Sequence, residues 1–147
     1  MTYKNLVDSL RNIIESHYFV ETYGFGEISD IAVPDNEEPP NYPYVFINPV
    51  DISNGLSSFQ WTFNMIVMTQ VNDGDDSELV GQDECIQIIQ DIVSTFISSN
   101  DNPFITFEEP FSITPFKERF QDDVVGATAN ITLNYGKSLD GCNVPIA

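Results

Sequence analysis

The stretch from Val124 to Tyr135 has the strict two-residue alternation of a β-strand, and neither of its faces carries a charge. One face is apolar and consists of Val125, Ala127, Ala129, Ile131, Leu133 and Tyr135. The other face consists of small neutral residues, namely Gly126, Thr128, Asn130, Thr132 and Asn134. A sheet surface in water usually carries Lys or Glu, and this chain has a formal net charge of -18. The pattern therefore predicts a strand whose second face is covered by another surface.

A second long strand, predicted over residues 58–71, has the same character. Its heavy apolar face consists of Phe59, Trp61, Phe63, Met65 and Val67, and its opposite face of Gln60, Thr62, Asn64, Ile66 and Met68. A strand over 44–50 precedes it. Asn54 and Gly55 predict a hairpin between these two strands, because both residues tolerate a positive φ. The sequence thus places two uncharged strand faces in one sheet.

Two amphipathic helices are predicted around these strands. The first covers residues 3–19, with Thr2 as its N-cap and an apolar stripe formed by Leu6, Leu10, Ile13, Ile14 and Tyr18. The second begins at a cap on Asp76 or Ser77 and ends near Ser98. Its stripe comprises Val80, Ile86, Ile89, Val93 and Phe96, widened by Cys85, Ile88, Ile92 and Ile97. Cys85 is expected to be a small buried hydrophobe.

Weaker signals complete the order of elements. Phe25, Ile28 and Ile31 suggest a short strand, and residues 34–43 form a proline-rich loop. Residues 104–116 predict one or two short strands broken by Pro110 and Pro115. The resulting order, α-β-β-β-α-β-β, predicts an α+β, two-layer sandwich. Its mostly antiparallel sheet has four to five strands, and its two main helices pack on one face. We expect one domain over 1–147, with an irregular C-terminal tail from about residue 136.

The charge balance excludes some functions. The chain has 23 acidic residues and five basic ones, so no basic patch can form to bind a phosphate backbone. An anionic surface either serves solubility or repels DNA that must move past it. The N-terminal twenty residues lack a signal-peptide core, and no apolar run reaches the roughly 20 residues that cross a bilayer. We therefore expect a soluble protein with no membrane partner, intracellular where it is made.

Candidates for chemistry are weak. In the acidic turn, Asp73, Asp75 and Ser77 alternate as in an EF-hand loop, but Glu78 stands where that loop needs Gly. A solvated, capped turn is the favoured interpretation, and a cation site is the alternative. His17 is the only histidine, and we expect it to have a packing or helix-surface role. No Cys-His or Ser-His constellation is visible, so the sequence predicts neither an enzyme nor a bound cofactor or metal.

Two of the five bases, Lys117 and Arg119, lie just before the last strand and beside Asp122 and Asp123. One interpretation is a local salt-bridged turn. The other is a bridge between subunits, in which a planar Arg fork meets the acidic rim of a neighbour. The sequence leaves both open.

Several stretches resemble those of a known family: "YGFGEISDI", "NYPYVFINP", "TPFKERFQDDVVGATANITL" and the terminal "CNVPIA". Their order and spacing along nearly the whole chain resemble the tail-terminator, or tail-completion, proteins of tailed bacteriophages. The resemblance implies an α/β fold and a ring, commonly of six subunits, that caps the tail tube and joins it to the neck. It implies no enzymatic activity and no cofactor. The chain departs from the family at Gly126 and Ala127, where many relatives are expected to have a larger aromatic residue.

This resemblance and the residue patterns lead to one hypothesis about the uncharged faces. In a virion ring of six or twelve copies, neighbouring subunits would cover them while DNA passes through without specific binding. Other neck and tail proteins are the further expected partners. The expected interface residues are Thr62, Asn64, Thr128, Asn130 and Thr132, with Lys117 and Arg119. The expected acidic channel or rim comprises Asp73, Asp75, Asp76, Asp122 and Asp123. The alternative is a monomeric acidic binding module, either calcium-dependent or mimicking the charge of DNA.

Overall fold

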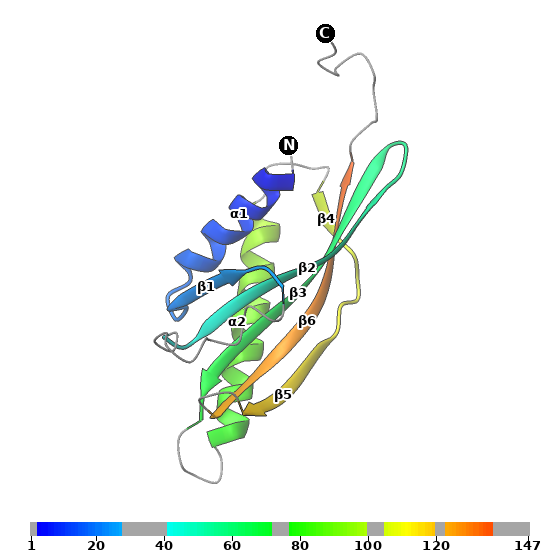
Figure 1. Cartoon of the computed structure of the whole chain (residues 1–147). Coiled ribbons are helices and arrows are strands. Elements are labelled where there is room, and N and C mark those ends of the chain that lie inside the picture. Colours follow the sequence, from blue (N-terminus) through cyan, green and yellow to red (C-terminus); the bar gives the residue numbers. More distant parts are fainter. Residues whose placement is uncertain (1–2, 28–40, 72–76, 100–104, 120–122, 137–147) are drawn as a thin grey trace.

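The computed structural model describes residues 3–27, 41–71, 77–99, 105–119 and 123–136, which form two helices and six strands (Figure 1). The helices are α1 (Tyr3–Ser16) and α2 (Ser77–Ser99). The strands are β1 (Thr22–Phe25), β2 (Tyr44–Asn54), β3 (Ser58–Gln70), β4 (Ile105–Phe107), β5 (Ile113–Arg119) and β6 (Asp123–Gly136). Thr2, Ile28, Ile31, most of the proline-rich loop and the tail after Gly136 lie outside the described residues.

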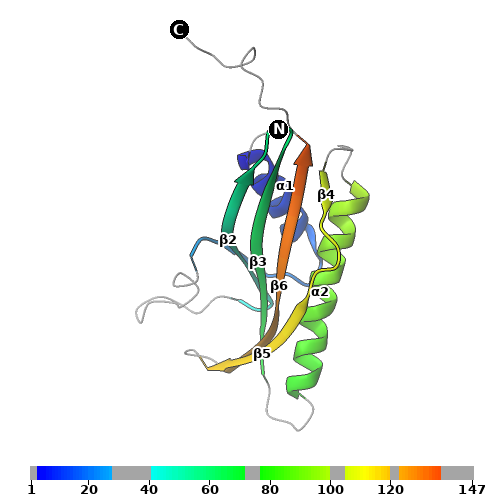
Figure 2. The ribbon, with the colours of Figure 1, turned by 90° about the vertical axis from the view of Figure 1, so that its right-hand side faces the viewer.

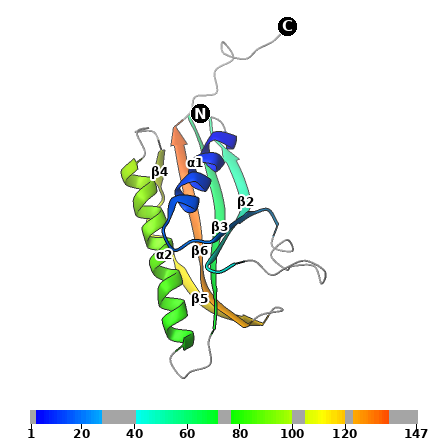
Figure 3. The ribbon, with the colours of Figure 1, turned by 90° about the vertical axis from the view of Figure 1, so that its left-hand side faces the viewer.

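All six strands belong to one sheet, in the order β1-β2-β3-β6-β4, with β5 also paired to β6. Only β1 and β2 run parallel; the other pairs are antiparallel. Both helices lie on one face of this sheet. Figure 3 is viewed from the helix side, whereas in Figure 2 α1 lies behind the strands. The expected α+β architecture, with a mostly antiparallel sheet and two helices on one face, is confirmed.

The sheet contains six strands, one more than the four to five predicted, because residues 105–119 contribute two strands, β4 and β5, the second of which Pro115 does not interrupt. The strand continues through Pro115, which lies opposite Ala127 of β6. Among the described strands, β5 pairs with β6 alone, so it is an edge strand. An edge strand tolerates proline because only one of its sides must supply N–H groups to the sheet. Pro110, in contrast, does lie between β4 and β5, as expected.

The main core lies between the helices and the sheet and follows the predicted alternation of β3 and β6. Its largest fully buried side chains include Trp61 and Phe63, which pack against Leu6 and Leu10 of α1. From α2 the core contains Cys85, Ile88, Ile89, Ile92, Val93 and Phe96. Tyr3 meets Trp61 edge-to-face, with ring centroids 5.3 Å apart. Burial of these two stripes is what holds the helices on the sheet.

Three residues predicted for the apolar stripes are exposed instead. Helix α1 ends at Ser16, not at residue 19, and Tyr18 is 90% exposed in the turn that follows. Val80 and Ile97 of α2 are also exposed. Val80 lies in the first turn of α2, and Ile97 is rotated about 100° from the buried Phe96, since an α-helix has 3.6 residues per turn. Helical periodicity alone therefore predicted apolar stripes that are wider than the part of each helix that the sheet covers.

The hairpin predicted at Asn54 and Gly55 is confirmed, but the reason given for it is wrong. Strands β2 and β3 pair antiparallel from Tyr44–Met68 to Asn54–Phe59, and the Gly55 N–H donates to the Ser58 carbonyl at 2.7 Å. Neither turn residue has a positive φ; among the described residues only Gly26 does. The register shifts once, between Pro49 and Asp51, and this bulge precedes the distal part of the hairpin.

Candidate assembly surface

The face of the sheet opposite the helices is the candidate functional surface. No helix of the described part of the chain covers it, as the view in Figure 2 shows. Across β3 and β6, pairs of residues on this face are aligned in register: Thr62 with Thr132, Asn64 with Asn130, and Ile66 with Thr128. The five interface residues predicted on these strands therefore form one continuous patch. We call it the uncharged face and include Asn48 of β2, which lies beside Asn64.

Three asparagines cross this face as a row of hydrogen-bonded side chains. The Asn130 Nδ2 donates to Asn64 Oδ1 at 3.0 Å, and the Asn64 Nδ2 donates to Asn48 Oδ1 at 3.4 Å. The Asn48 Nδ2 in turn donates to the Gly26 carbonyl at 3.0 Å. Each amide thus has a fixed orientation before any partner arrives. Asn48 was not among the predicted interface residues, although it alternates with Tyr44 and Phe46 along β2.

Hydroxyl groups continue the pattern on either side of the asparagine row. The Thr62 and Thr132 Oγ1 atoms lie 3.0 Å apart and share a hydrogen bond. Thr128 lies between Ile66 of β3 and Thr114 of β5. Thr62, Thr128 and Thr132 are half-buried, and Asn130 is exposed. A protein surface that docked here would desolvate amides and hydroxyls, which costs far less than desolvating unpaired charges.

One end of the same face is covered by the chain itself. Tyr44, Phe46, Ile66, Met68 and Val124 form a second cluster of buried residues, and Tyr42 and Phe116 pack against it. Phe116 lies over Gly126, because the two residues are paired between β5 and β6. Aromatic side chains thus close one end of the face, whereas none of the helices and strands that the structure describes covers the amide and hydroxyl end.

The structure places Lys117 away from the uncharged face. Its Nζ forms an ion pair with the Glu78 carboxylate at the start of α2, on the helix side of the sheet. This contact favours a local salt bridge over a bridge between subunits, although the partner is Glu78 and not Asp122 or Asp123. Both side chains are exposed, so the pair contributes under ~1 kcal/mol. Arg119 ends β5, but its side chain is outside the described residues.

The predicted acidic rim is not located by the structure. Asp73, Asp75, Asp76 and Asp122 lie outside the described segments, and only the backbone of Asp123 is described, at the start of β6. Of the candidate EF-hand loop, Asp73 and Asp75 fall in the same gap, whereas Ser77 and Glu78 belong to the first turn of α2. Within the described residues, no three His, Cys, Asp or Glu side chains lie close enough to hold a metal ion.

His17 joins the end of α1 to α2. Its Nδ1 accepts a hydrogen bond from the Phe19 N–H at 3.2 Å, so its Nε2 is the nitrogen that donates to Asp91 Oδ2, 3.0 Å away. This hydrogen bond, followed by one from Gln87, holds the pKa of Asp91 below its ordinary value. The His17 ring is 12% exposed. Its geometry is that of a packing residue, as the sequence suggested.

Cys85 is free and buried among core residues, and burial raises the pKa of its thiol to about 12. The thiol therefore stays protonated and unreactive near neutral pH. It contributes to the core as a small hydrophobe, as expected.

Comparisons with known proteins add no assignment: no family model and no curated protein matches the sequence. Neither described helix is long and apolar enough to span a membrane.

Proposed function

We propose that this chain is a structural virion protein that assembles into a homo-oligomeric ring at the neck, or at the end of the tail tube, of a tailed bacteriophage. The ring has six or twelve subunits, has no catalytic activity and needs no cofactor. The observation that carries the proposal is the uncharged face, with its row of oriented asparagines, in a chain of net charge -18. The stretches similar to tail-terminator proteins support the same function.

Electrostatics explains why the contact between copies would use this face. Two chains of charge -18 repel each other wherever their acidic surfaces come within about a Debye length, roughly 8 Å at physiological salt. An interface of Thr and Asn buries no like charges and can exchange hydrogen bonds with the neighbour. The amide and hydroxyl end of the face is bordered by the buried aromatics Tyr44 and Phe46, which carry no charge either.

In such a ring the acids concentrate on loops and on the inner wall. Asp73, Asp75, Asp76, Asp122 and Asp123 are the candidates for that lining. A negative wall repels the phosphates of DNA, so DNA passes with few contacts that release counterions. Other neck and tail proteins would bind the two ends of the ring.

Substitutions on the uncharged face test the proposal. The wild-type protein should form a closed oligomer, measured by native mass spectrometry and seen as a ring by electron microscopy. Thr128→Lys and Asn64→Glu each bury a charge in the interface, so each should yield a folded monomer. Ser94→Lys is the matched control, because Ser94 is an exposed residue of α2 on the other side of the sheet. It should assemble like the wild type.

Two outcomes would contradict this assignment. If the Thr128 and Asn64 variants assemble normally, the subunits meet through another surface. If the wild-type protein is a monomer at all concentrations, the ring is wrong, and the monomeric acidic binding module becomes the better hypothesis.

A further inference from the structure

The distal part of the β2–β3 hairpin, residues 50–58, exposes apolar side chains that belong to neither cluster of buried residues. We call this segment the hairpin arm. Val50 is 54% exposed, Ile52 42% and Leu56, at the tip, 84%. In Figure 1 the arm extends past the end of β4 and away from both helices. Exposed apolar residues gathered on a projecting hairpin are typical of a docking element.

The arm is also unusually free of charge. Asp51 is its only ionisable residue, and no charged residue occurs between Ile52 and Asn72 in the sequence. On the uncharged side of the sheet, Asp51 and Ser53 of the arm lie opposite Thr62 and Gln60, whereas Ile52 lies opposite Trp61 and so points to the helix side. Ile52 is therefore available to a partner on the helix side of the sheet, and not to one that covers the uncharged face.

A second exposed apolar patch lies in the turn between α1 and β1. Tyr18 and Phe19 are both exposed, and their rings meet edge-to-face with centroids 5.3 Å apart. We call residues 17–20 the aromatic turn. It is held in place by the Val20 N–H, which donates to the His17 carbonyl at 3.2 Å, and by the hydrogen bond between His17 and Asp91. Rigid, exposed aromatic side chains of this kind are favoured anchors in protein interfaces.

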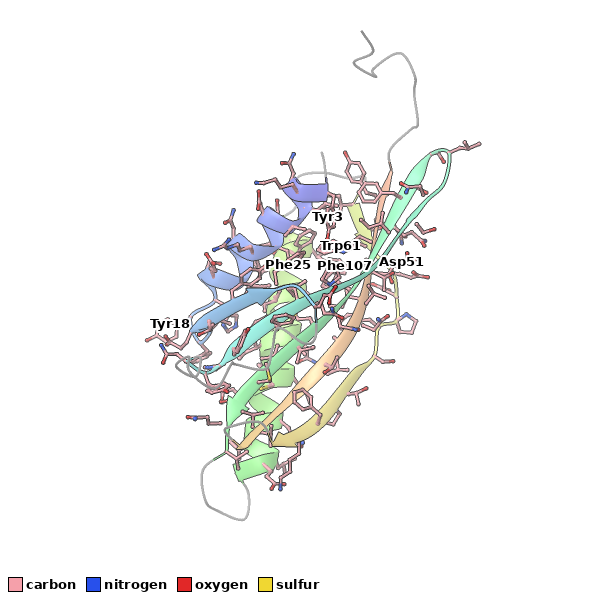
Figure 4. The ribbon with its side chains drawn as sticks, in the orientation of Figure 1. Tyr3, Tyr18, Phe25, Asp51, Trp61 and Phe107 are labelled. Carbon is pink, nitrogen blue, oxygen red and sulfur yellow. The ribbon has the colours of Figure 1, made fainter. Side chains whose placement is uncertain are left out.

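The two patches lie on opposite sides of the molecule. In Figure 4 Tyr18 projects at one side, and the hairpin arm extends at the other. One chain therefore cannot join its own arm to its own aromatic turn. Two different patches on opposite sides are what a head-to-tail contact between identical chains requires, and such contacts form a ring when the rotation between subunits closes.

We infer that the hairpin arm of one subunit packs Val50, Ile52 and Leu56 against Tyr18 and Phe19 of the next subunit. This inference rests on the proposed ring and names the surfaces that propagate it. A second copy is the occupant that the charges favour, because the apolar side chains that would meet carry no charge, on a chain whose copies otherwise repel each other. An aliphatic arm and an aromatic receiver also complement each other chemically.

Disulfide crosslinking between subunits tests the inference. Cys142 is replaced by Ser, and Cys85 stays in place because it is buried. One preparation carries Leu56→Cys and another carries Tyr18→Cys; the two are mixed and oxidised. A disulfide needs Cβ atoms about 3.5–4.5 Å apart, so a covalent dimer forms only where arm and aromatic turn meet. In a chain carrying both substitutions, we expect a ladder of covalent multimers up to the full ring.

Leu79→Cys provides the matched control, because Leu79 is 69% exposed on α2 and belongs to neither patch. Mixed with Leu56→Cys, it should give no specific dimer. A ring of normal mass in which the 18–56 pair crosslinks no better than the 79–56 pair would overturn the inference and leave the proposed function standing. A wild-type protein that stays monomeric would instead overturn the ring itself. Leu56→Asp should also prevent assembly while leaving the monomer folded, since Leu56 is not part of the core.

Discussion

At Gly126 of β6, an added methyl group should strongly lower the free energy of unfolding. A Cβ at this position would lie 1.9 Å from the Val67 carbonyl oxygen and 2.8 Å from Cζ of Phe116. Carbon and oxygen atoms in adjacent strands normally stay about 3.3–3.6 Å apart, so β3 and β6 would have to separate by more than about 1 Å. Both strands are central in the sheet and buried here, and they cannot relax without losing their pairing.

The cost of Gly126→Ala follows from these contacts. Overpacking of a core typically costs about 1–3 kcal/mol, and each strained ladder hydrogen bond adds about 1 kcal/mol. Alanine also lowers the conformational entropy of the unfolded chain, but this offsets the loss of stability by only about 0.4–1 kcal/mol. We expect a net loss of about 3 kcal/mol. With a urea dependence of about 2 kcal/mol per molar, the unfolding midpoint should fall by about 1.5 M.

The assay is urea unfolding followed by far-UV circular dichroism, with all variants at one protein concentration, because assembly adds to apparent stability. Gly55→Ala is the control: its Cβ would lie 3.5 Å from the Ser58 carbonyl oxygen, an ordinary contact, and should change stability by less than about 0.5 kcal/mol. Adding Phe116→Ala should not rescue Gly126→Ala, because the shorter contact is with backbone. Equal midpoints for the two glycine variants would refute the close approach of β3 and β6.

Two further predictions concern α2. Ile89→Ala should lower the free energy of unfolding by about 2–5 kcal/mol in the same urea assay, because Ile89 is fully buried. Val80→Ala should lower it by less than about 0.5 kcal/mol, because Val80 is 62% exposed. Equal losses for the two variants would mean that α2 is rotated from its described orientation. Asp91 has a lowered pKa in the folded state, so its carboxylate stabilises the protein above the unfolded pKa of about 3.9, and this contribution is lost as pH falls through the lower folded pKa. Asp91→Asn should therefore be less stable than the wild type at pH 7, and the difference in unfolding midpoint should shrink below about pH 4. A difference independent of pH would show that the carboxylate charge is not what stabilises the contact with His17.

Much of the fold could be predicted because its signals are local. Period-two alternation identified β3 and β6 and assigned their faces correctly. The apolar spacing of α2, and a start beside a cap on Asp76 or Ser77, were also predicted from neighbouring residues alone. The α+β class followed from the order of these elements. Such signals can be recognised in the sequence because each depends on residues two to four positions apart in the chain.

Predictions failed where the outcome depends on what lies beside a segment. Tyr18 continues the apolar spacing of α1, but the helix ends before it, and no sheet lies beneath its ring. Pro115 was expected to end a strand, yet an edge position tolerates it. The ion pair of Lys117 joins residues 39 positions apart, and no local pattern could have identified Glu78 as its partner.

The candidate surface also has features that depend on neighbouring residues in the chain and features that depend on distant ones. Sequence alone established that Thr62, Asn64, Thr128, Asn130 and Thr132 lie on uncharged strand faces, because alternation fixes the side to which each residue points. Only the tertiary structure decided that these faces adjoin, that Asn48 completes their row and that Phe116 closes one end. Those facts depend on strand register, which is set by contacts between residues far apart in the chain and by the packing of the whole sheet on its helices.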